Sequence, residues 1–249
     1  MKYSVCIDAV YAGMDPAQAI RESAQMGFPA VEFWSWWDKD LPRINEAAQE
    51  MGVEIAACCT RLVPLTEQGK ETDFLQGLQE SMKAAKSLRC KRLIAQAGND
   101  TGEPAEVQGG RIVHTLKQAA PLLESEGITL LLEPLNGRID HPGYFLASSE
   151  AGLRLIQEVD SPSVRLLFDL YHQQISEGDL LRRLEGNLEW VGHLHAAGNP
   201  GRHELDRGEL NYPWIFRRLK EMGYAGLIGL EYHPEEPVGE GFKRLPDLG

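Results

Sequence analysis

Short apolar runs alternate along the chain with longer runs in which apolar and polar residues recur at helical spacing. The short runs are typical of buried strands, whereas the longer runs are typical of amphipathic helices. Strands that alternate with helices pair in parallel through right-handed crossovers. The pattern therefore predicts eight parallel strands, at residues 3–9, 30–34, 54–60, 92–98, 129–135, 164–170, 190–196 and 226–233.

Three of the helical runs end in the same way. Residues 15–27, 41–52 and 212–223 each close on Met-Gly, and the next strand begins shortly afterwards. Glycine at that place suits the left-handed position that ends many helices, so the recurrence indicates a repeated helix–strand unit. The residues after the last strand are rich in Gly and Pro, and the final helix is therefore predicted to be short or irregular.

A closed (β/α)₈ barrel, or TIM barrel, fits both the order of the elements and the length of the chain. Such barrels typically need roughly 250 residues, and the chain has 249. The alternative is a doubly wound open sheet, but the turn after the first strand reads DAVYAGMDP and lacks a Gly-rich phosphate-binding pattern. We therefore predict an α/β fold with a single TIM-barrel domain over residues 1–249.

Composition and charge narrow the function. The formal net charge of −12 repels phosphate backbones, so the sequence favours a small neutral or metal-chelated substrate over nucleic acid. No window approaches the roughly 18 apolar residues of a membrane helix, and no signal peptide is evident, so we expect a cytoplasmic protein without a membrane partner. The cysteines form no CxxC pair and are expected to be reduced core residues. The sequence does not specify the oligomeric state, and a homo-oligomer is one possibility.

Ionisable residues come at the ends of four successive predicted strands. Glu133, Asp169 and Glu231 each follow an apolar run, His195 lies in GHLH, and the carboxyl ends of barrel strands form the active sites of this fold. Buried carboxylates cost several kcal/mol unless a cation or hydrogen bonds compensate them. Three carboxylates and one imidazole suit Mn²⁺ or Mg²⁺ and tolerate Co²⁺. One divalent metal ion is therefore predicted at this end of the barrel.

Four segments resemble one known family. EPLNGRIDHPGYFL, FDLYHQQ, GHLHAAGNPGRHELDRGELNYPW and GLEYHP, within residues 129–234, look like the hydroxypyruvate isomerase family. That family belongs to the xylose-isomerase-like TIM barrel superfamily, which also contains ketose 3-epimerases and an apurinic endonuclease. The resemblance implies a metal-dependent isomerase of carbohydrate metabolism, although fold membership alone does not choose the reaction.

The resemblance also implies roles for individual residues. Glu133 and Glu231 would be both metal ligands and the catalytic acid/base pair, with Asp169 and His195 as the other ligands. His172 and Arg202 would bind or polarise the substrate. In addition, the aromatic run FWSWW predicts a hydrophobic wall for the substrate carbons, with Trp34 as its main residue.

Several functions share such a site. We favour isomerisation of hydroxypyruvate, or of a related short keto acid or sugar, through an enediolate. Ketose 3-epimerisation is the alternative, because the proton then returns to the opposite face of the same carbon instead of to the neighbouring carbon. The chain departs from the family at His195, where hydroxypyruvate isomerases often carry Gln and ketose epimerases carry His, so the resemblance does not fix the exact substrate. An abasic-site nuclease conflicts with the acidic charge, and a non-catalytic sugar-binding barrel conflicts with the paired glutamates.

Two further residues on the strands have open roles. Glu32 is predicted either to contact the substrate or to pair with a cation inside the barrel. His193 points to the same side of its strand as His195 and is expected to be a hydrogen-bonded barrel histidine.

Overall fold

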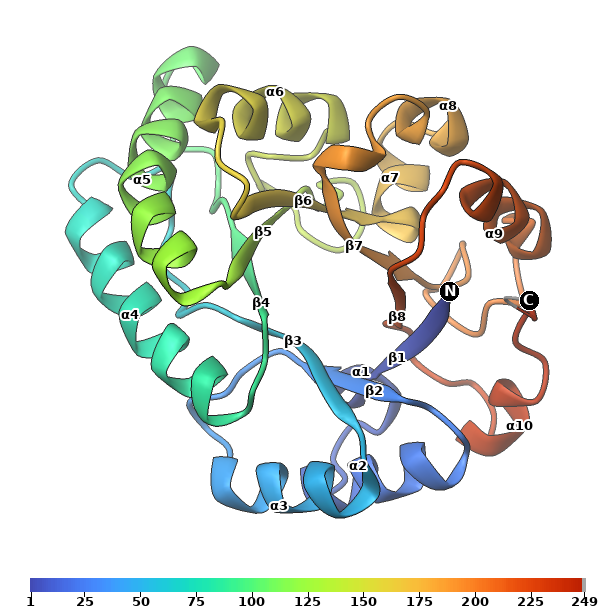
Figure 1. The fold of residues 1–249 in the computed structure, drawn as a ribbon. Helices are drawn as coiled ribbons and strands as arrows, with labels where there is room; N and C mark the ends of the chain where they lie inside the picture. The colour runs from blue at the N-terminus through green and yellow to red at the C-terminus, as the bar shows by residue number, and fades with distance from the viewer. Residues whose placement is uncertain (248–249) are drawn as a thin grey trace.

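The computed structural model describes residues 1–247, and in it eight parallel strands close into a barrel in sequence order (Figure 1). β1 pairs with both β2 and β8, so the sheet has no open edge and the doubly wound alternative is wrong. All eight predicted strands are confirmed, and each ends within three residues of its predicted end. The strands are β1 (Lys2–Cys6), β2 (Ala30–Phe33), β3 (Glu54–Cys59), β4 (Arg92–Gln96), β5 (Thr129–Glu133), β6 (Val164–Asp169), β7 (Val191–Ala196) and β8 (Leu227–Leu230).

Helices surround the barrel on the outside (Figure 1). Three of them, the ones predicted from the Met-Gly repeats, begin at an Asp or Asn side chain that caps the helix just before a proline-containing first turn. The helices are α1 (Ile7–Val10), α2 (Pro16–Gln25), α3 (Leu41–Met51), α4 (Glu71–Ser87), α5 (Ala105–Glu126), α6 (Ser149–Val159), α7 (Leu170–Ser176), α8 (Leu180–Leu184), α9 (Tyr212–Glu221) and α10 (Val238–Phe242), with a 3₁₀ turn, η1, at Leu188–Trp190.

The last helix, α10, is short, as predicted. The end of the first strand was predicted too late, because residues 7–9 begin the helical turn α1. An apolar run of this kind looks the same in a strand and in a buried helical turn. The turn places Asp8 where its carboxylate accepts hydrogen bonds from the backbone N–H of Trp34 (2.8 Å) and from Lys39 (3.0 Å). It therefore fixes the loop that follows β2.

The interior of the barrel has an apolar side and a polar side. Five buried residues from β3 to β6 form a separate apolar cluster there: Ala57, Cys59, Ile94, Leu131 and Leu167. Across from them, Ser4, Glu32 and His193 are at most 2% exposed and come from β1, β2 and β7. Since charged groups are buried only when they are paired, the polar side must form its own hydrogen bonds.

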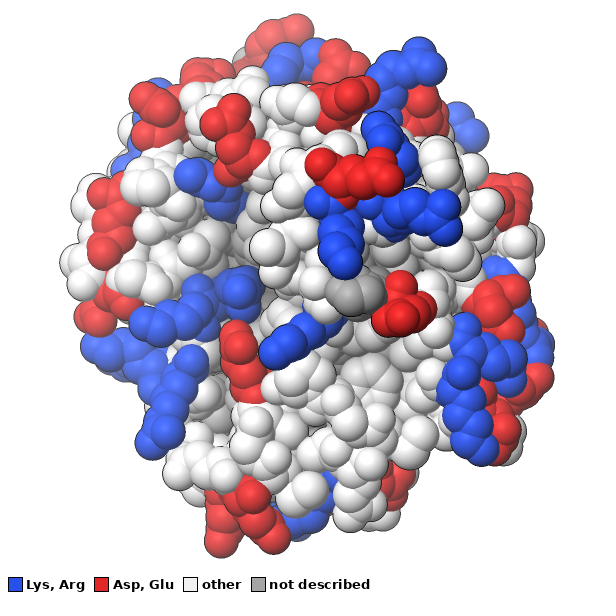
Figure 2. Space-filling model, turned by 45° about the vertical axis from the view of Figure 1, so that its right-hand side comes forward, with Lys and Arg blue, Asp and Glu red and all other residues white. Residues whose placement is uncertain are grey.

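Two further expectations concern the surface and the cysteines. All four cysteines are free and buried, as predicted. On the face drawn in Figure 2, acidic and basic side chains are interspersed rather than gathered into one broad basic area. Within the described residues, no helix combines the length and the apolar character needed to cross a membrane.

Candidate active site

The predicted strand-end residues lie together at one end of the barrel. Glu133 and Asp169 are the last residues of β5 and β6, His195 lies near the end of β7, and Glu231 directly follows β8. Asp169 is the register partner of His195. All four residues are at most 5% exposed. Parallel pairing thus brings side chains that are far apart in sequence into one buried group.

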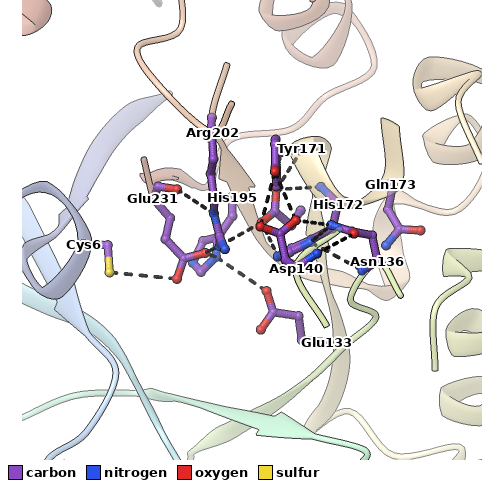
Figure 3. A network of polar contacts seen from close by, with 12 residues as sticks. Cys6, Glu133, Asn136, Asp140, Tyr171, His172, Gln173, His195, Arg202 and Glu231 are labelled. Atoms are coloured by element: carbon purple, nitrogen blue, oxygen red, sulfur yellow. Dashed lines mark hydrogen bonds and ion pairs between the residues drawn. The ribbon is translucent and has the colours of Figure 1, made fainter. Parts of the chain in front are cut away.

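His195 lies between the two glutamates (Figure 3). Its Nδ1 is 3.4 Å from Glu231 Oε2 and 3.7 Å from Glu133 Oε1. The carboxylates of Glu133, Asp169 and Glu231 also offer ligand atoms within 4.8 Å of one another, and His172 shares this spacing. His195 meets the same criterion with Glu32 and His193 instead. The geometry therefore gives the site two candidate imidazoles, where the sequence predicted one.

The carboxylates differ in their electrostatic surroundings. Burial and the neighbouring Glu231 raise the pKa of Glu133 to about 8. Burial also raises the pKa of Asp169. Burial opposes ionisation of Glu231 as well, but Arg202 and His195 outweigh it and hold the pKa of Glu231 well below its usual range. Opposite shifts in two neighbouring carboxyl groups are typical of an acid and base pair.

Several atoms of the site are suited to a cation. Glu133 Oε1 and His195 Nδ1 are buried and have no hydrogen-bond partner among the described residues. A nitrogen lone pair that faces two carboxylates is unfavourable, so either a proton or a cation must lie between them. Burial lowers the pKa of His195, but Glu32 and Glu231 together raise it well above its ordinary value. A divalent ion could take the place of this proton.

Arg202 reaches the site from the loop between β7 and α9. Its Nη2 donates to Glu231 Oε2 at 2.5 Å and lies 4.0 Å from Asp169 Oδ2. Its backbone is in the left-handed region, at φ 59°, which is uncommon for a residue with a side chain. Gly198, earlier in the loop, is needed for close packing, because a Cβ there would lie 2.4 Å from the carbonyl oxygen of Glu204. The loop is therefore shaped to direct one guanidinium at the carboxylates.

Trp34 follows β2 and forms part of the wall of the site. Its indole Nε1 donates to Glu231 Oε1 at 2.5 Å, while 38% of the side chain remains exposed. A cavity of about 470 Å³ lies beside it, and both glutamates, Arg202 and His172 line this cavity. The cavity is also lined by Cys59, Ile94, Gln96 and His141, for which the sequence gave no functional signal.

A second group of polar residues holds His172 (Figure 3). Asn136 Nδ2 is 2.6 Å from both His172 Nδ1 and Asp140 Oδ2, and Tyr171 OH donates to the same carboxylate at 3.0 Å. Burial and the nearby Arg202 lower the pKa of His172 to about 3, so this ring is neutral. Asn136 was missed by sequence reasoning, because only the tertiary contact reveals its role.

Glu32 and His193 lie deeper in the barrel. Glu32 Oε2 accepts from His193 Nε2 at 3.0 Å and from His195 Nε2 at 3.2 Å, and Glu32 Oε1 accepts from Ser4 Oγ at 3.0 Å. Glu32 thus pairs inside the barrel, which is one of the two roles predicted for it. His193 is a hydrogen-bonded barrel histidine, as predicted.

Comparison with known proteins identifies similar chains. The family model of the xylose isomerase-like TIM barrel matches residues 20–248. A 2-oxo-tetronate isomerase of Cupriavidus necator is 37% identical over 73% of this chain and 70% of its own. A hydroxypyruvate isomerase of Escherichia coli is 29% identical over 98% of this chain and 97% of its own. A solved structure from Brucella melitensis, described as an AP endonuclease of family 2, superposes with a TM-score of 0.93 at 30% identity, covering 99% of this chain and 100% of that one.

Proposed function

This chain belongs to the xylose isomerase-like TIM barrel family, and from that premise we propose that it isomerises hydroxypyruvate or a related short keto acid or sugar. The observation that carries the proposal is the pair of carboxylates of Glu133 and Glu231. Both lie within 3.7 Å of His195 Nδ1, and both line the same cavity. Two carboxyl groups that face one substrate can take a proton from one carbon and return it to the next.

Glu133, Asp169, His195 and Glu231 are the proposed ligands of one divalent cation, with Mn²⁺ first, Mg²⁺ second and Co²⁺ tolerated. When bound, such an ion polarises the carbonyl and hydroxyl oxygens of the substrate and makes the C–H between them more acidic. Glu133 Oε1 and His195 Nδ1, which have no hydrogen-bond partner within residues 1–247, support this ligand set.

The ligand set is tested by calorimetry on Asp169→Asn. Asp169 also caps α7, where its Oδ1 accepts from the backbone N–H of Tyr171 at 2.8 Å. Asparagine keeps an acceptor for that cap and removes the charge, so metal affinity should fall while the fold remains. Metal affinity equal to that of the wild type would remove Asp169 from the proposed set.

The two glutamates are proposed to have different starting states. Arg202 and Trp34 hold Glu231 as a carboxylate, so Glu231 takes the C–H proton of the substrate. Glu133, which is more easily protonated, holds or returns a proton on the other side. Arg202 and His172 orient and polarise the oxygens of the resulting enediolate, and Trp34 packs against the substrate carbons.

Turnover in deuterium oxide, followed by NMR, tests the reaction. With hydroxypyruvate and Mn²⁺ or Mg²⁺, we expect 2-hydroxy-3-oxopropanoate with deuterium at C2, because the glutamates exchange their proton with solvent before returning it. Complete retention of the original hydrogen would indicate a hydride shift and would leave the glutamates as ligands only. No conversion of hydroxypyruvate, of a four-carbon 2-oxo acid or of a short sugar would refute the proposal.

Epimerisation at C3 of a free ketose is the second candidate, and the cavity is large enough for its substrate. A volume of about 470 Å³ lies within the range of roughly 300 to 1,000 Å³ typical of small-molecule sites. It leaves room for a substrate longer than three carbons. The same glutamate pair would then return the proton to the opposite face of the same carbon. Assays on ketoses under the same conditions distinguish the two products.

A further inference from the structure

His172 and His195 each form a hydrogen bond on the side of the ring that faces away from the cavity, but the two partners differ in chemistry. Each ring has one nitrogen bonded to a residue outside the cavity and one buried nitrogen without a partner among the described residues. In a neutral imidazole one nitrogen carries the proton and the other a lone pair, and the partner of one nitrogen decides the state of the other. The residues behind the rings therefore determine what each histidine presents to the site.

The partner of His172 is a donor. Asn136 Oδ1 accepts from the backbone N–H groups of Ile139 (3.0 Å) and Asp140 (3.2 Å), so the amide cannot be turned around. Its NH₂ group must therefore face His172 Nδ1, at 2.6 Å. An amide NH₂ only donates, so Nδ1 accepts and the ring proton is on Nε2. Nε2 lies 3.5 Å from Asp169 Oδ2, and His172 lines the cavity. His172 thus presents an N–H group, which cannot ligate a metal.

The partner of His195 is an acceptor. Glu32 Oε2 accepts hydrogen bonds from both His195 Nε2, at 3.2 Å, and His193 Nε2, at 3.0 Å. The proton of His195 is therefore on Nε2, and the opposite nitrogen, Nδ1, faces Glu133 and Glu231. With a metal ion in place of the proton on Nδ1, His195 has the same tautomer as His172 but turns its other edge toward the site. Its Nδ1 lone pair then ligates the metal.

The neighbouring strand leaves room for the Glu32–His195 contact. Gly229 on β8 is the register partner of His195. A Cβ at Gly229 would lie 2.1 Å from Glu32 Oε1 and 2.5 Å from His195 Cδ2. Any other residue at this position would displace the pair. The lack of a side chain at Gly229 thus leaves the space that the Glu32–His195 contact needs, which supports the contact independently of its distance.

We propose that Glu32 and Asn136 are positioning residues, which make His195 a metal ligand and His172 a hydrogen-bond donor to the substrate. The proposal rests on the proposed function for the metal and the substrate, but it concerns residues that touch neither. The spacing of the site would allow either His172 or His195 to be a metal ligand, and the proposal assigns this role to His195. Outer partners of this kind typically change metal affinity by about 10- to 100-fold when they are removed.

Metal affinity, measured by calorimetry with Mn²⁺, tests the role of Glu32. Glu32→Met removes the acceptor with little change in length and should weaken binding by about 10- to 100-fold. Glu32→Gln is the matched control, because its carbonyl oxygen can still accept from both histidines while its NH₂ faces Ser4. It should lose less affinity than Glu32→Met. Unchanged affinity in Glu32→Met, or equal losses in the two variants, would overturn the positioning role.

NMR of ¹⁵N-labelled histidine tests both rings without any turnover. In the metal-free wild type, His172 should show a bare Nδ1 and a protonated Nε2. With Mg²⁺ bound, His195 should show a protonated Nε2. In Asn136→Asp, which turns the donor into an acceptor, Nδ1 of His172 should gain a proton. A protonated Nδ1 in the wild type, or a bare one in Asn136→Asp, would overturn the assignment.

The two proposals fail separately. An enzyme that converts none of the substrates would refute the proposed function, whereas the ring states and metal affinities would still decide the roles of Glu32 and Asn136. Conversely, an active isomerase with His172 as a metal ligand would retain the function and refute the positioning roles.

Discussion

The two halves of the barrel mouth are built from the same strand–helix units, yet they carry opposite kinds of side chain. The ends of β5 to β8 bring ionisable groups to the site: Glu133, Asp169, His195 and Glu231. The ends of β2 to β4 bring mainly neutral groups to the cavity, namely Trp34, Cys59, Ile94 and Gln96, and Asp38 in the loop after β2 is the charged exception. On the proposed function, one half would carry the reaction and the other half would shape the space for the substrate.

The physical reason for the contrast is the cost of burying charge. Buried carboxylates need a compensating partner, and Arg202 and His195 supply it in the charged half. The neutral half needs no such network, because Asp38, its carboxylate at the cavity, is 60% exposed, and the wall is otherwise largely apolar. The separation is not complete, because Glu32 on β2 forms a hydrogen bond with His195 deeper in the barrel. The neutral half therefore also contributes to the chemistry, through a residue outside the cavity.

The largest expected effect is in the charged half. Glu133→Gln and Glu231→Gln each remove an acid/base group and a charged ligand, so turnover should fall by about 10²- to 10⁴-fold. Glu54→Gln is the matched control, because this glutamate lies at the other end of β3 and pairs with Arg92 at 3.3 Å. Steady-state assays with saturating metal measure the effect. Activity near that of the wild type in either site variant would mean that this half does not carry the reaction.

A smaller loss is expected for the residues that polarise the substrate. Arg202→Ala and His172→Ala should keep metal binding but lose turnover by about 10²- to 10³-fold, the typical effect of removing a donor to a developing oxyanion. Arg207→Ala is the control, because Arg207 lies in the same loop but pairs with Glu235 and Glu236. Calorimetry and kinetics on the same samples separate the two functions. If both variants lost the metal, the division between ligands and polarising residues would be wrong.

The sequence predicted the charged half better than the neutral half. Apolar strands that end in a carboxylate or a histidine stand out, because an uncompensated charge at such a place is unfavourable. Glu133, Asp169, His195 and Glu231 were therefore predicted, and the structure brings them together. Of the neutral residues, Trp34 was predicted from its aromatic run, whereas Cys59 and Ile94 gave no signal because they look like ordinary core residues.

The positioning roles were missed for a different reason, although Glu32 itself was predicted to pair inside the barrel or to contact the substrate. Asn136 and Glu32 act through partners 36 and 163 positions away in sequence, His172 and His195 respectively. The chemistry of an amide or a carboxylate does not reveal which nitrogen of a distant ring it will meet. His172 was predicted at the site, but its spacing to the carboxylates, which equals that of a ligand, appears only in the fold. Contacts of this kind depend on strand register and loop shape, which the hydrophobic pattern does not specify.

The stability of the metal-free protein should depend on pH because of the charged half. The pKa of Glu133 is about 8 in the fold against an ordinary value of 4.5, so its contribution to stability is complete below pH 4.5 and is lost as the pH rises through 8. His195, whose pKa is also raised, acts in the same direction above pH 6.5. Urea unfolding with a chelator should therefore give a free energy of unfolding that falls over this pH window.

Two comparisons make this pH experiment decisive. Glu133→Gln should show a shallower fall and should be more stable than the wild type at pH 8, because no buried carboxyl group has to ionise. Saturating metal should remove most of the pH dependence, since an ion at about 100 times its dissociation constant adds about 2.7 kcal/mol. An equally steep fall in Glu133→Gln would show that the pH dependence arises elsewhere.

The smallest effect is expected in the neutral half, at Trp34. Trp34→Phe keeps an apolar ring but loses the indole N–H that donates to Glu231. A hydrogen bond to a charged group contributes about 1.5 kcal/mol or more when it is buried, and Trp34 is 38% exposed, so we expect a loss in kcat/KM of about tenfold. Trp34→Ala also removes the wall and should raise KM further, whereas Trp214→Phe, on an exposed part of α9, serves as the control. Equal kinetics for Trp34→Phe and Trp34→Ala would show that the indole N–H matters and the wall does not. If both variants had wild-type KM values, the neutral half would have no part in recognising the substrate, and the contrast between the two halves would reduce to the placement of charge alone.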